Sequence, residues 1–106
     1  MGMKEVFAGI QEKLNADPSK MAGLAATYQF SLSGDGGGEY FAVFDNGTAQ
    51  VNEGTADDPS ITISMEAADF QDMVDGKLDG MGAFMSGKLK VTGDMSLAMR
   101  LQTLLS

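Results

Sequence analysis

The chain has no cysteine and no histidine among its 106 residues. Without cysteine there is no disulfide, no thiol nucleophile and no thiolate metal site. Without histidine the sequence lacks the usual general base at neutral pH and the commonest metal ligand. We therefore expect a protein that is not an enzyme and that holds no metal or cofactor.

Long apolar runs are also missing. No stretch approaches the roughly 18 apolar residues of a membrane-spanning helix, and the chain does not begin with a charged and then apolar leader. These patterns favour a cytoplasmic protein. Basic residues are scarce as well, because seven Lys and Arg stand against 15 Asp and Glu, which gives a net charge of −8. Nucleic-acid binding depends on a basic surface, so we expect no nucleic-acid partner.

The charge is unevenly distributed along the chain. Residues 1–76 carry three basic and thirteen acidic side chains, whereas residues 77–106 carry four basic and two acidic ones. An anionic head group or a lipid surface would most easily approach this second region. The alternative is that its four cations are simply solvated. They are Lys77, Lys88, Lys90 and Arg100.

Hydrophobic periodicity predicts helices and strands in a definite order. Apolar residues at helical spacing indicate helices over about 3–14, 18–25, 66–75 and 95–105, with a short apolar connection at 78–85 that has room for one helical turn. Alternating residues indicate strands over about 28–33, 39–45, 48–53, 60–65 and 88–92. Asn46-Gly47 predicts a type I′ hairpin turn between the second and third strands. The glycine-rich segment 34–38 joins two strands and lacks the lysine of a phosphate-binding loop.

Four of the five strands have one apolar and one polar face, and the strand at 39–45 has apolar residues on both faces, which favours a central position. The pattern predicts a single α+β domain over 1–106. Its sheet would be mostly antiparallel and five-stranded, with one face covered by about five helices.

Methionine is unusually frequent, with nine residues in the chain. In the last predicted helix, seven of eleven residues are apolar. Five of them form one arc, while Met95 and Met99 form a second arc that needs its own cover. Methionine fills irregular gaps and recurs on adaptable binding surfaces. Two interpretations remain open, a methionine-rich core and the pliable wall of a cavity.

The segment GKLKVTGDMSLAMRLQTLL resembles the carboxyl-terminal signature of the sterol carrier protein type 2 family. The resemblance extends upstream through Ser60–Thr62, Ala68–Phe70, Gly76–Leu78 and Ala83–Phe84, and it covers about the last fifty residues. Before Asp57 only the order of elements agrees. The resemblance implies a small lipid-binding domain with an apolar tunnel between sheet and helices, of a kind that also occurs fused to enzymes.

These features together predict a non-catalytic lipid carrier that holds a fatty acyl chain, acyl-CoA, sterol or phospholipid in an apolar tunnel. A monomer is favoured, and transient contact with a membrane surface is compatible with this role. The residues expected to contact a lipid head group are Lys88, Lys90 and Arg100. Those expected to line the tunnel are Phe41, Val43, Ile63, Phe70, Met73, Met81, Phe84, Met85, Met95, Met99 and Leu104.

Two other functions are weighed against the carrier. The second arc of the last helix suits an interaction module, in which Met95 and Met99 form a homodimer or partner interface. An enzyme that uses carboxylates alone is the third hypothesis. Acidic residues do cluster in sequence, but none of the clusters has the spacing of a calcium loop. They are Asp35 and Glu39, Asp57 and Asp58, and Asp69, Asp72 and Asp75.

Overall fold

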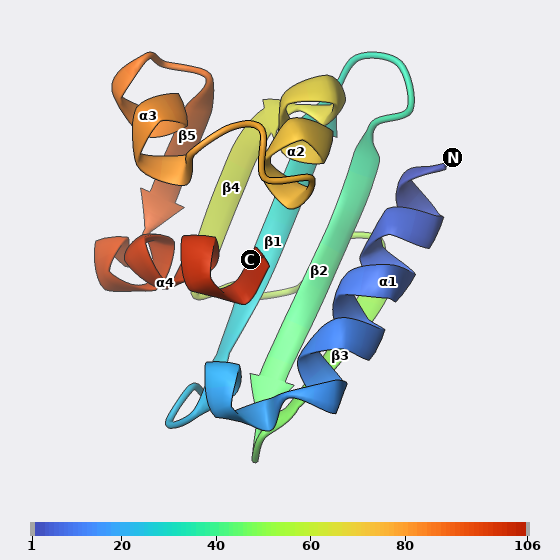
Figure 1. The fold of residues 1–106 in the computed structure, drawn as a ribbon, viewed down its shortest axis with the longest axis vertical. Helices are drawn as coiled ribbons and strands as arrows, with labels where there is room; N and C mark the ends of the chain where they lie inside the picture. Colours follow the sequence, from blue (N-terminus) through green and yellow to red (C-terminus); the bar gives the residue numbers. More distant parts are fainter. Residues whose placement is uncertain (1, 106) are drawn as a thin grey trace.

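The structure is a computed structural model that describes residues 2–105, so Met1 and Ser106, the two ends of the predicted domain, lie outside the described residues. Its centre is a five-stranded sheet of order β3-β2-β1-β4-β5 (Figure 1). The strands are β1 (Ala26–Ser33), β2 (Gly38–Asp45), β3 (Thr48–Glu53), β4 (Ile61–Glu66) and β5 (Leu89–Gly93). Neighbours pair antiparallel except β1 and β4, which pair in parallel. The mostly antiparallel α+β fold is thus confirmed, and β2, which was expected to be central, is an interior strand that pairs with β1 on one side and β3 on the other.

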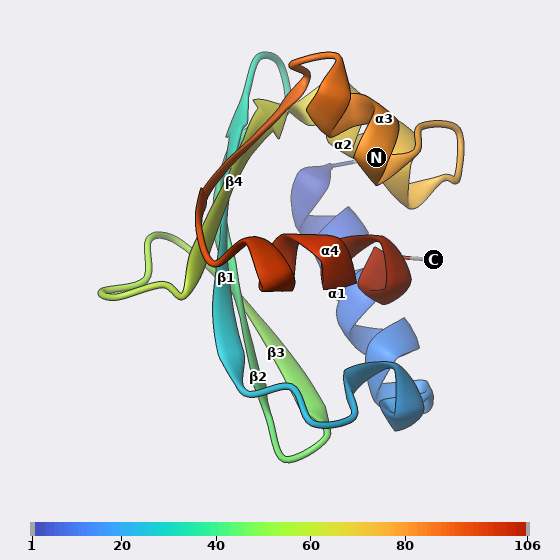
Figure 2. The ribbon, with the colours of Figure 1, turned by 90° about the vertical axis from the view of Figure 1, so that its left-hand side faces the viewer.

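In the part of the chain that the structure describes, five helical elements lie on one side of the sheet and none on the other (Figure 2). They are α1 (Met3–Ala16), the 3-10 helix η1 (Pro18–Met21), α2 (Ala67–Val74), α3 (Gly80–Met85) and α4 (Met95–Leu105). The apolar connection at 78–85 therefore contains a true helix, which begins where the Asp79 carboxylate accepts a hydrogen bond from the Gly82 amide at 3.2 Å. No helix within residues 2–105 is long and apolar enough to cross a membrane.

The hairpin turn predicted from the sequence is present, and a glycine also ends the second α-helix. Asn46 and Gly47 both have positive φ, 51° and 77°, between β2 and β3. Gly76 adopts φ 79° just after α2, and its amide donates to the carbonyl of Met73. A positive φ has little energetic cost for glycine and a small one for asparagine, so these residue types in sequence indicate such backbone conformations.

The covered face is closely packed with aromatic rings on the side of α1. Phe7 from α1 stacks on Tyr40 of β2 at 4.5 Å and on Phe70 of α2 at 5.1 Å between ring centroids. Phe30 of β1 lies 5.3 Å from Phe7 as well. The apolar void left in this region is only about 10 Å³, which is no larger than the space one water molecule requires.

A loop over residues 54–60 connects β3 to β4 across the helix-free face (Figure 2). Gln29 of β1 holds it there and is only 3% exposed. Its Nε2 donates to the Gly54 carbonyl at 3.1 Å, and its Oε1 accepts from the Ala56 amide at 2.7 Å. The loop carries the chain past β2 and β1, and this crossing allows β4 to pair with β1 in parallel.

Candidate functional site

An apolar cleft of about 290 Å³ lies between α3, α4 and β5. Its apolar walls come from all three elements. They comprise Met81 and Phe84 of α3, Leu89 and Val91 of β5, and Met95, Ala98, Met99 and Leu101 of α4. The polar residues Asp79 and Gln102 are also part of the lining. The cleft is therefore suited to a ligand that offers apolar surface and few directional contacts.

The local sequence explains how β5 and α4 form two of these walls. Alternation along β5 directs Leu89 and Val91 toward the helices. At Gly93 the chain turns with φ 116°, and a Cβ there would lie 2.7 Å from the Ser60 carbonyl oxygen, so only glycine fits so close to β4. Asp94 then opens α4, because its carboxylate accepts a hydrogen bond from the Ser96 amide at 2.9 Å.

Tyr28 ties the amino-terminal half of α4 to the middle of the sheet. The Tyr28 hydroxyl donates to the carbonyl oxygen of Leu97 at 2.5 Å. Burial of the phenol, which disfavours its charged form, raises the pKa of Tyr28 to about 12. Tyr28 therefore stays neutral and keeps its proton for this bond at physiological pH.

Three further hydrogen bonds fix α4 relative to its neighbours. The Arg100 guanidinium donates to the backbone carbonyls of Lys20 and Ala22, at the end of η1 and just after it, at 3.3 and 3.2 Å. The Gln102 side-chain oxygen accepts from the Gly80 amide at 2.5 Å, which joins α4 to the start of α3. Of these contacts, the bond between Gln102 and Gly80 joins two residues that line the cleft and so holds α3 and α4 together at its edge.

Leu101 separates the cleft from the interior. It is 3% exposed, and it lines both the cleft and the small void beneath α1. The void is too small for an acyl chain. The apolar space described here is therefore an outer cleft bounded on its inner side by Leu101, and the tunnel implied by the sequence resemblance stays a prediction.

The structure divides the residues expected to line the tunnel. Met81, Phe84, Met95 and Met99 lie together in the cleft wall, and their contact with a lipid stays a prediction. Met85 is 80% exposed and outside the cleft. The remaining helix-side residues are buried in the closely packed core, at 0–3% exposure. They are Ile63, Phe70, Met73 and Leu104.

The assignment of Phe41 and Val43 to the tunnel is corrected. Tyr40, Ala42 and Phe44 of β2 are the buried residues on the helix side, and Phe41 and Val43 alternate with them. Both therefore point to the opposite face of the sheet. Their partial burial reflects apolar residues on both faces of β2, which the sequence pattern could not assign to one side or the other.

Four apolar cleft residues were missed as site residues, namely Leu89, Val91, Ala98 and Leu101, and so were the other lining residues Asp79, Gly80 and Gln102. A signal for two of them was present, because alternation already placed Leu89 and Val91 on the buried face of the last strand. What the sequence lacked was the information that α3 would leave part of that face uncovered.

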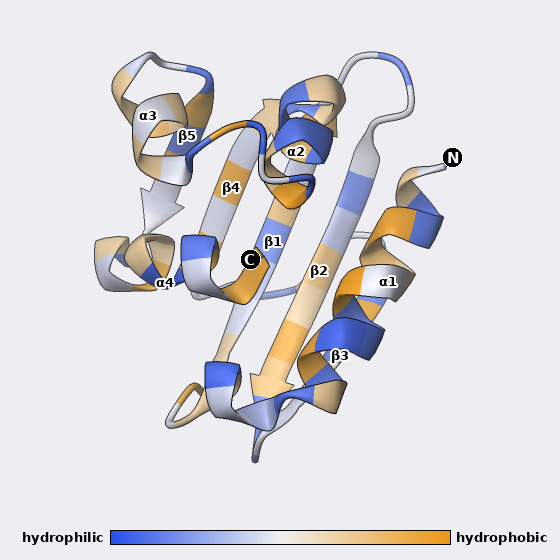
Figure 3. Cartoon of the chain, in the orientation of Figure 1, coloured by the Kyte–Doolittle hydropathy of each residue, from blue (hydrophilic) through white to orange (hydrophobic). Residues whose placement is uncertain are grey.

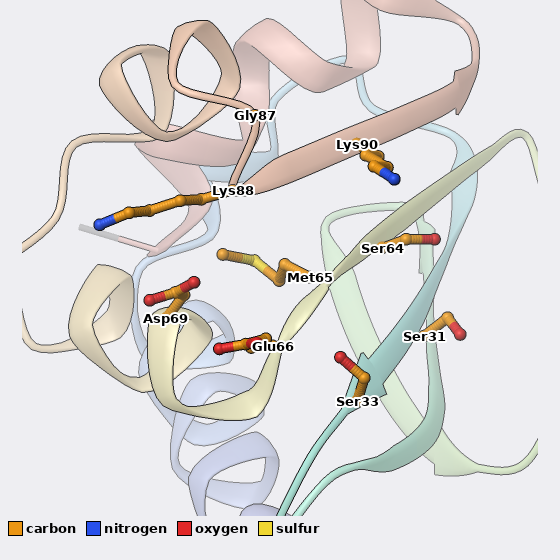
Figure 4. Close-up of a pocket in the computed structure, with 9 residues that line it drawn as sticks. All are labelled: Ser31, Ser33, Ser64, Met65, Glu66, Asp69, Gly87, Lys88 and Lys90. Carbon is orange, nitrogen blue, oxygen red and sulfur yellow. The ribbon is translucent and has the colours of Figure 1, made fainter.

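The predicted head-group cations are not at the cleft. Lys90 alternates with Leu89 and Val91, so it points to the helix-free side of β5, whereas Lys88 precedes β5 and its side chain extends toward the side of α2 (Figure 4). Both line a shallow polar depression of about 600 Å³ (Figure 4). Arg100 is engaged with the two carbonyls near η1.

The depression of Figure 4 has mixed charge. Lys90, Ser64 and Ser31 lie in one row across β5, β4 and β1. The Lys88 side chain extends toward the side where Asp69 of α2 lies, and Glu66 stands nearby (Figure 4). Two ammonium groups and two carboxylates nearly balance, so the depression offers no strong preference for an anion or a cation.

The acidic clusters of the sequence do not assemble into a metal site. Within residues 2–105 no group of three or more Asp or Glu side chains could hold a metal ion. The hydrogen bonds that Asp94 receives from the Ser96 side chain and amide lower the pKa of its carboxyl. Asp94 therefore acts as a helix cap in this structure.

Together, a one-sided sheet covered by helices and an apolar cleft under the last helix define a small α+β domain that binds apolar ligands. The family model of the SCP-2 sterol transfer family matches residues 7–106. The chain therefore belongs to this family of lipid-binding and lipid-transfer domains, as the signature of its last fifty residues indicated.

Relatives and solved structures agree with this membership. The chain is 38% identical over 104 residues to hydroxysteroid dehydrogenase-like protein 2 of Xenopus tropicalis, covering 97% of this chain and 24% of that protein. It is 36% identical over 103 residues to human sterol carrier protein 2, covering 93% of this chain and 19% of that protein. The chain thus spans about a quarter or less of the length of these relatives. The solution structure of sterol carrier protein domain 2 of Helicoverpa armigera superposes with a TM-score of 0.79 at 26% identity, over 95% of this chain and 83% of that one.

Proposed function

We propose that this domain is a non-catalytic lipid carrier that holds an apolar chain in the cleft between α3, α4 and β5. The observation that carries the proposal is the make-up of the cleft, eight of whose eleven lining residues are apolar side chains from three different elements. Burial of each methylene of a lipid contributes roughly 0.8 kcal/mol. A fatty acyl chain, alone or as part of an acyl-CoA or phospholipid, adds this contribution to its binding free energy for every methylene that it buries. A sterol also buries apolar surface, but as a wider ring system.

The size of the cleft favours an acyl chain over the bulkier ring system of a sterol. Its volume of about 290 Å³ is at the lower limit of small-molecule sites, which are typically about 300–1,000 Å³. Methionine has three rotatable side-chain bonds and adapts to irregular shapes. Rotation of Met81, Met95 and Met99 is the way in which the cleft would enlarge around a ligand.

An anionic head group has one route to the predicted cations. β5 is an edge strand, so a ligand that leaves the cleft over this edge reaches the depression that Lys88 and Lys90 line together with Glu66 and Asp69. We keep these two lysines as head-group candidates and drop Arg100, because its guanidinium already donates to two backbone carbonyls.

Filling the cleft tests the carrier directly. Ala98 lines it from α4, and Ala98→Trp places an indole where the ligand would lie. Ala16→Trp is the matched control, because Ala16 is exposed at the end of α1 and lines no part of the cleft. We expect Ala98→Trp to weaken uptake of a fluorescent fatty acid at least about tenfold and the control to bind like the unmodified chain. Equal binding by both variants, each shown to be folded by circular dichroism, would overturn the proposal.

A second function is favoured by one observation, the high exposure of Met85 and Met99, at 80% and 69%. Such side chains suit an interface with a second copy of the chain or with an enzyme domain to which this one is accessory. Sedimentation at increasing concentration, together with a lipid-uptake assay, separates the two functions, because a carrier stays monomeric and takes up lipid, whereas an interaction module forms a dimer and takes up none.

The cytoplasmic location expected from the sequence stays a prediction, which cell fractionation would test.

A further inference from the structure

The described methionines fall into two groups by exposure. Four of them belong to the core and are 1–8% exposed, namely Met3, Met21, Met65 and Met73. The other four are 47–80% exposed and lie on α3 and α4, namely Met81, Met85, Met95 and Met99. Because the chain has no cysteine, these four thioethers are the sulfur atoms of the described chain that a dissolved oxidant reaches most easily.

Three of the exposed methionines line the cleft. Met81 of α3 and Met95 and Met99 of α4 belong to its wall, whereas Met85, the most exposed of the four at 80%, lines no part of it. The six residues of α3 are all glycine, alanine, methionine or phenylalanine, and in Figure 3 its coil shows no hydrophilic colour. Three of the eight apolar residues in the wall can therefore be oxidised, and Met85 is an exposed reference outside the wall.

Oxidation reverses the polarity of a thioether. A hydroperoxide transfers one oxygen atom to the sulfur, so an S–O bond forms as the O–O bond breaks, and the peroxide leaves as an alcohol or, from hydrogen peroxide, as water. The sulfoxide oxygen accepts hydrogen bonds from water. An acyl chain has no donor to offer it, so binding of the chain would remove that water without replacing the hydrogen bond. An oxidised wall therefore disfavours the ligand that the reduced wall suits.

We propose that Met81, Met95 and Met99 form a reversible oxidation site that controls lipid binding by the cleft. A hydroperoxide converts them to sulfoxides and lowers the affinity for an apolar chain, and methionine sulfoxide reductases, each specific for one sulfoxide epimer, restore it. The core methionines are shielded, so the fold stays intact. A bound chain covers the three cleft sulfurs, so a loaded cleft is oxidised more slowly than an empty one. The inference rests on the proposed carrier function and adds a chemical control of the same cleft.

Peroxide treatment followed by a binding assay tests the site. We expect hydrogen peroxide to form sulfoxide at the three cleft positions and at Met85 faster than at Met21 and Met73, read by mass spectrometry of peptides. Uptake of a fluorescent fatty acid should fall at least about tenfold, and the two reductases together should restore it. Full uptake by a chain with sulfoxide at all three cleft positions would overturn the proposal, as would a loss of uptake that accompanies unfolding in circular dichroism.

Variants separate the cleft from the other exposed sulfur. Met85→Leu removes the exposed methionine outside the cleft, so this variant should take up fatty acid normally and still lose uptake after peroxide. The triple variant Met81→Leu, Met95→Leu, Met99→Leu keeps the wall apolar and cannot be oxidised there. Whatever its starting affinity, peroxide should change that affinity by less than about twofold. An equal loss of uptake in the triple variant and the unmodified chain would contradict the assignment.

Protection by the ligand completes the test. A saturating, non-fluorescent fatty acid added before hydrogen peroxide should slow sulfoxide formation at the three cleft positions and leave the rate at Met85 unchanged. Equal rates at the cleft positions with and without fatty acid would overturn the proposal. Absence of uptake by the untreated chain is a different result, because it rejects the carrier function itself and with it this inference.

Discussion

The two halves of the covered face use the same apolar residue types in opposite ways. On the side of α1, Phe7 stacks on Tyr40 and Phe70 and lies tilted against Phe30, and these rings leave only about 10 Å³ of void. On the side of α3, flexible methionines surround an open cleft of about 290 Å³. The difference shows that stability and binding are carried by separate parts of one small sheet. Rigid aromatic residues fill the first part, and methionine keeps the second adaptable.

The largest expected effect comes from the packed half. Phe7 is 2% exposed and contacts three aromatic rings, so Phe7→Ala should reduce the free energy of unfolding by about 3–5 kcal/mol. Met99→Ala, in the cleft and 69% exposed, should change it by less than about 0.5 kcal/mol. Urea denaturation measures both. Similar losses in the two variants would contradict the division between a stabilising half and a binding half.

Leu101 lies on the boundary of the two halves, and removing it should join them. Leu101→Ala should lower the free energy of unfolding of the ligand-free protein by about 2–5 kcal/mol, because it enlarges an interior void. We expect a saturating fatty acid to raise the melting temperature of Leu101→Ala more than that of the unmodified chain, since the ligand now fills both spaces. Equal shifts in differential scanning fluorimetry would show that the void and the cleft stay separate.

Tyr28 connects the halves through its bond to the Leu97 carbonyl. Tyr28→Phe should lower the free energy of unfolding by about 0.5–1.5 kcal/mol and should make α4 less firmly held against the sheet. In the folded state the pKa of Tyr28 is raised from 10.0 to about 12. Its neutral form is therefore favoured by folding, and this contribution is complete below pH 10.0 and is lost as the pH rises toward about 12. Stability measured across this alkaline range should fall less steeply in Tyr28→Phe. An identical pH dependence of stability in both proteins would show that a group other than Tyr28 is responsible for it.

A smaller effect is expected at Asp94, which caps the helix of the binding half. Hydrogen bonds to the Ser96 side chain and amide lower the pKa of the Asp94 carboxyl below its usual value. The cap therefore contributes stability above the ordinary pKa of aspartate and loses it as the pH falls through the lowered value. Asp94→Ala should make the chain less stable at neutral pH, and the difference should shrink in acid. A difference that is constant with pH in thermal melts would show that the charge of Asp94 does not matter.

Much of the fold was predictable because its signals are local. The alternation of Tyr28, Phe30 and Leu32 indicates a strand with one buried face, and Asn46-Gly47 supplies the positive φ that a tight hairpin requires. The site was predictable only in part. Met95 and Met99 were identified as a second apolar arc because helical spacing places them together, and both line the cleft. Phe41 was misplaced because β2 is apolar on both faces, and no local pattern says which face receives the helices.

By itself the sequence determined most of the elements, the buried faces of the strands that are apolar on one side only, and the family, since each of these follows from the spacing of residue types within short segments. Only the tertiary structure decided that the loop at 54–60 crosses the helix-free face, that Leu101 closes the interior, and that four methionines remain on the surface. The reason is physical. Exposure and cavity volume depend on how segments far apart in the chain pack against one another, and an amphipathic pattern shows only that a side chain needs cover, not what covers it.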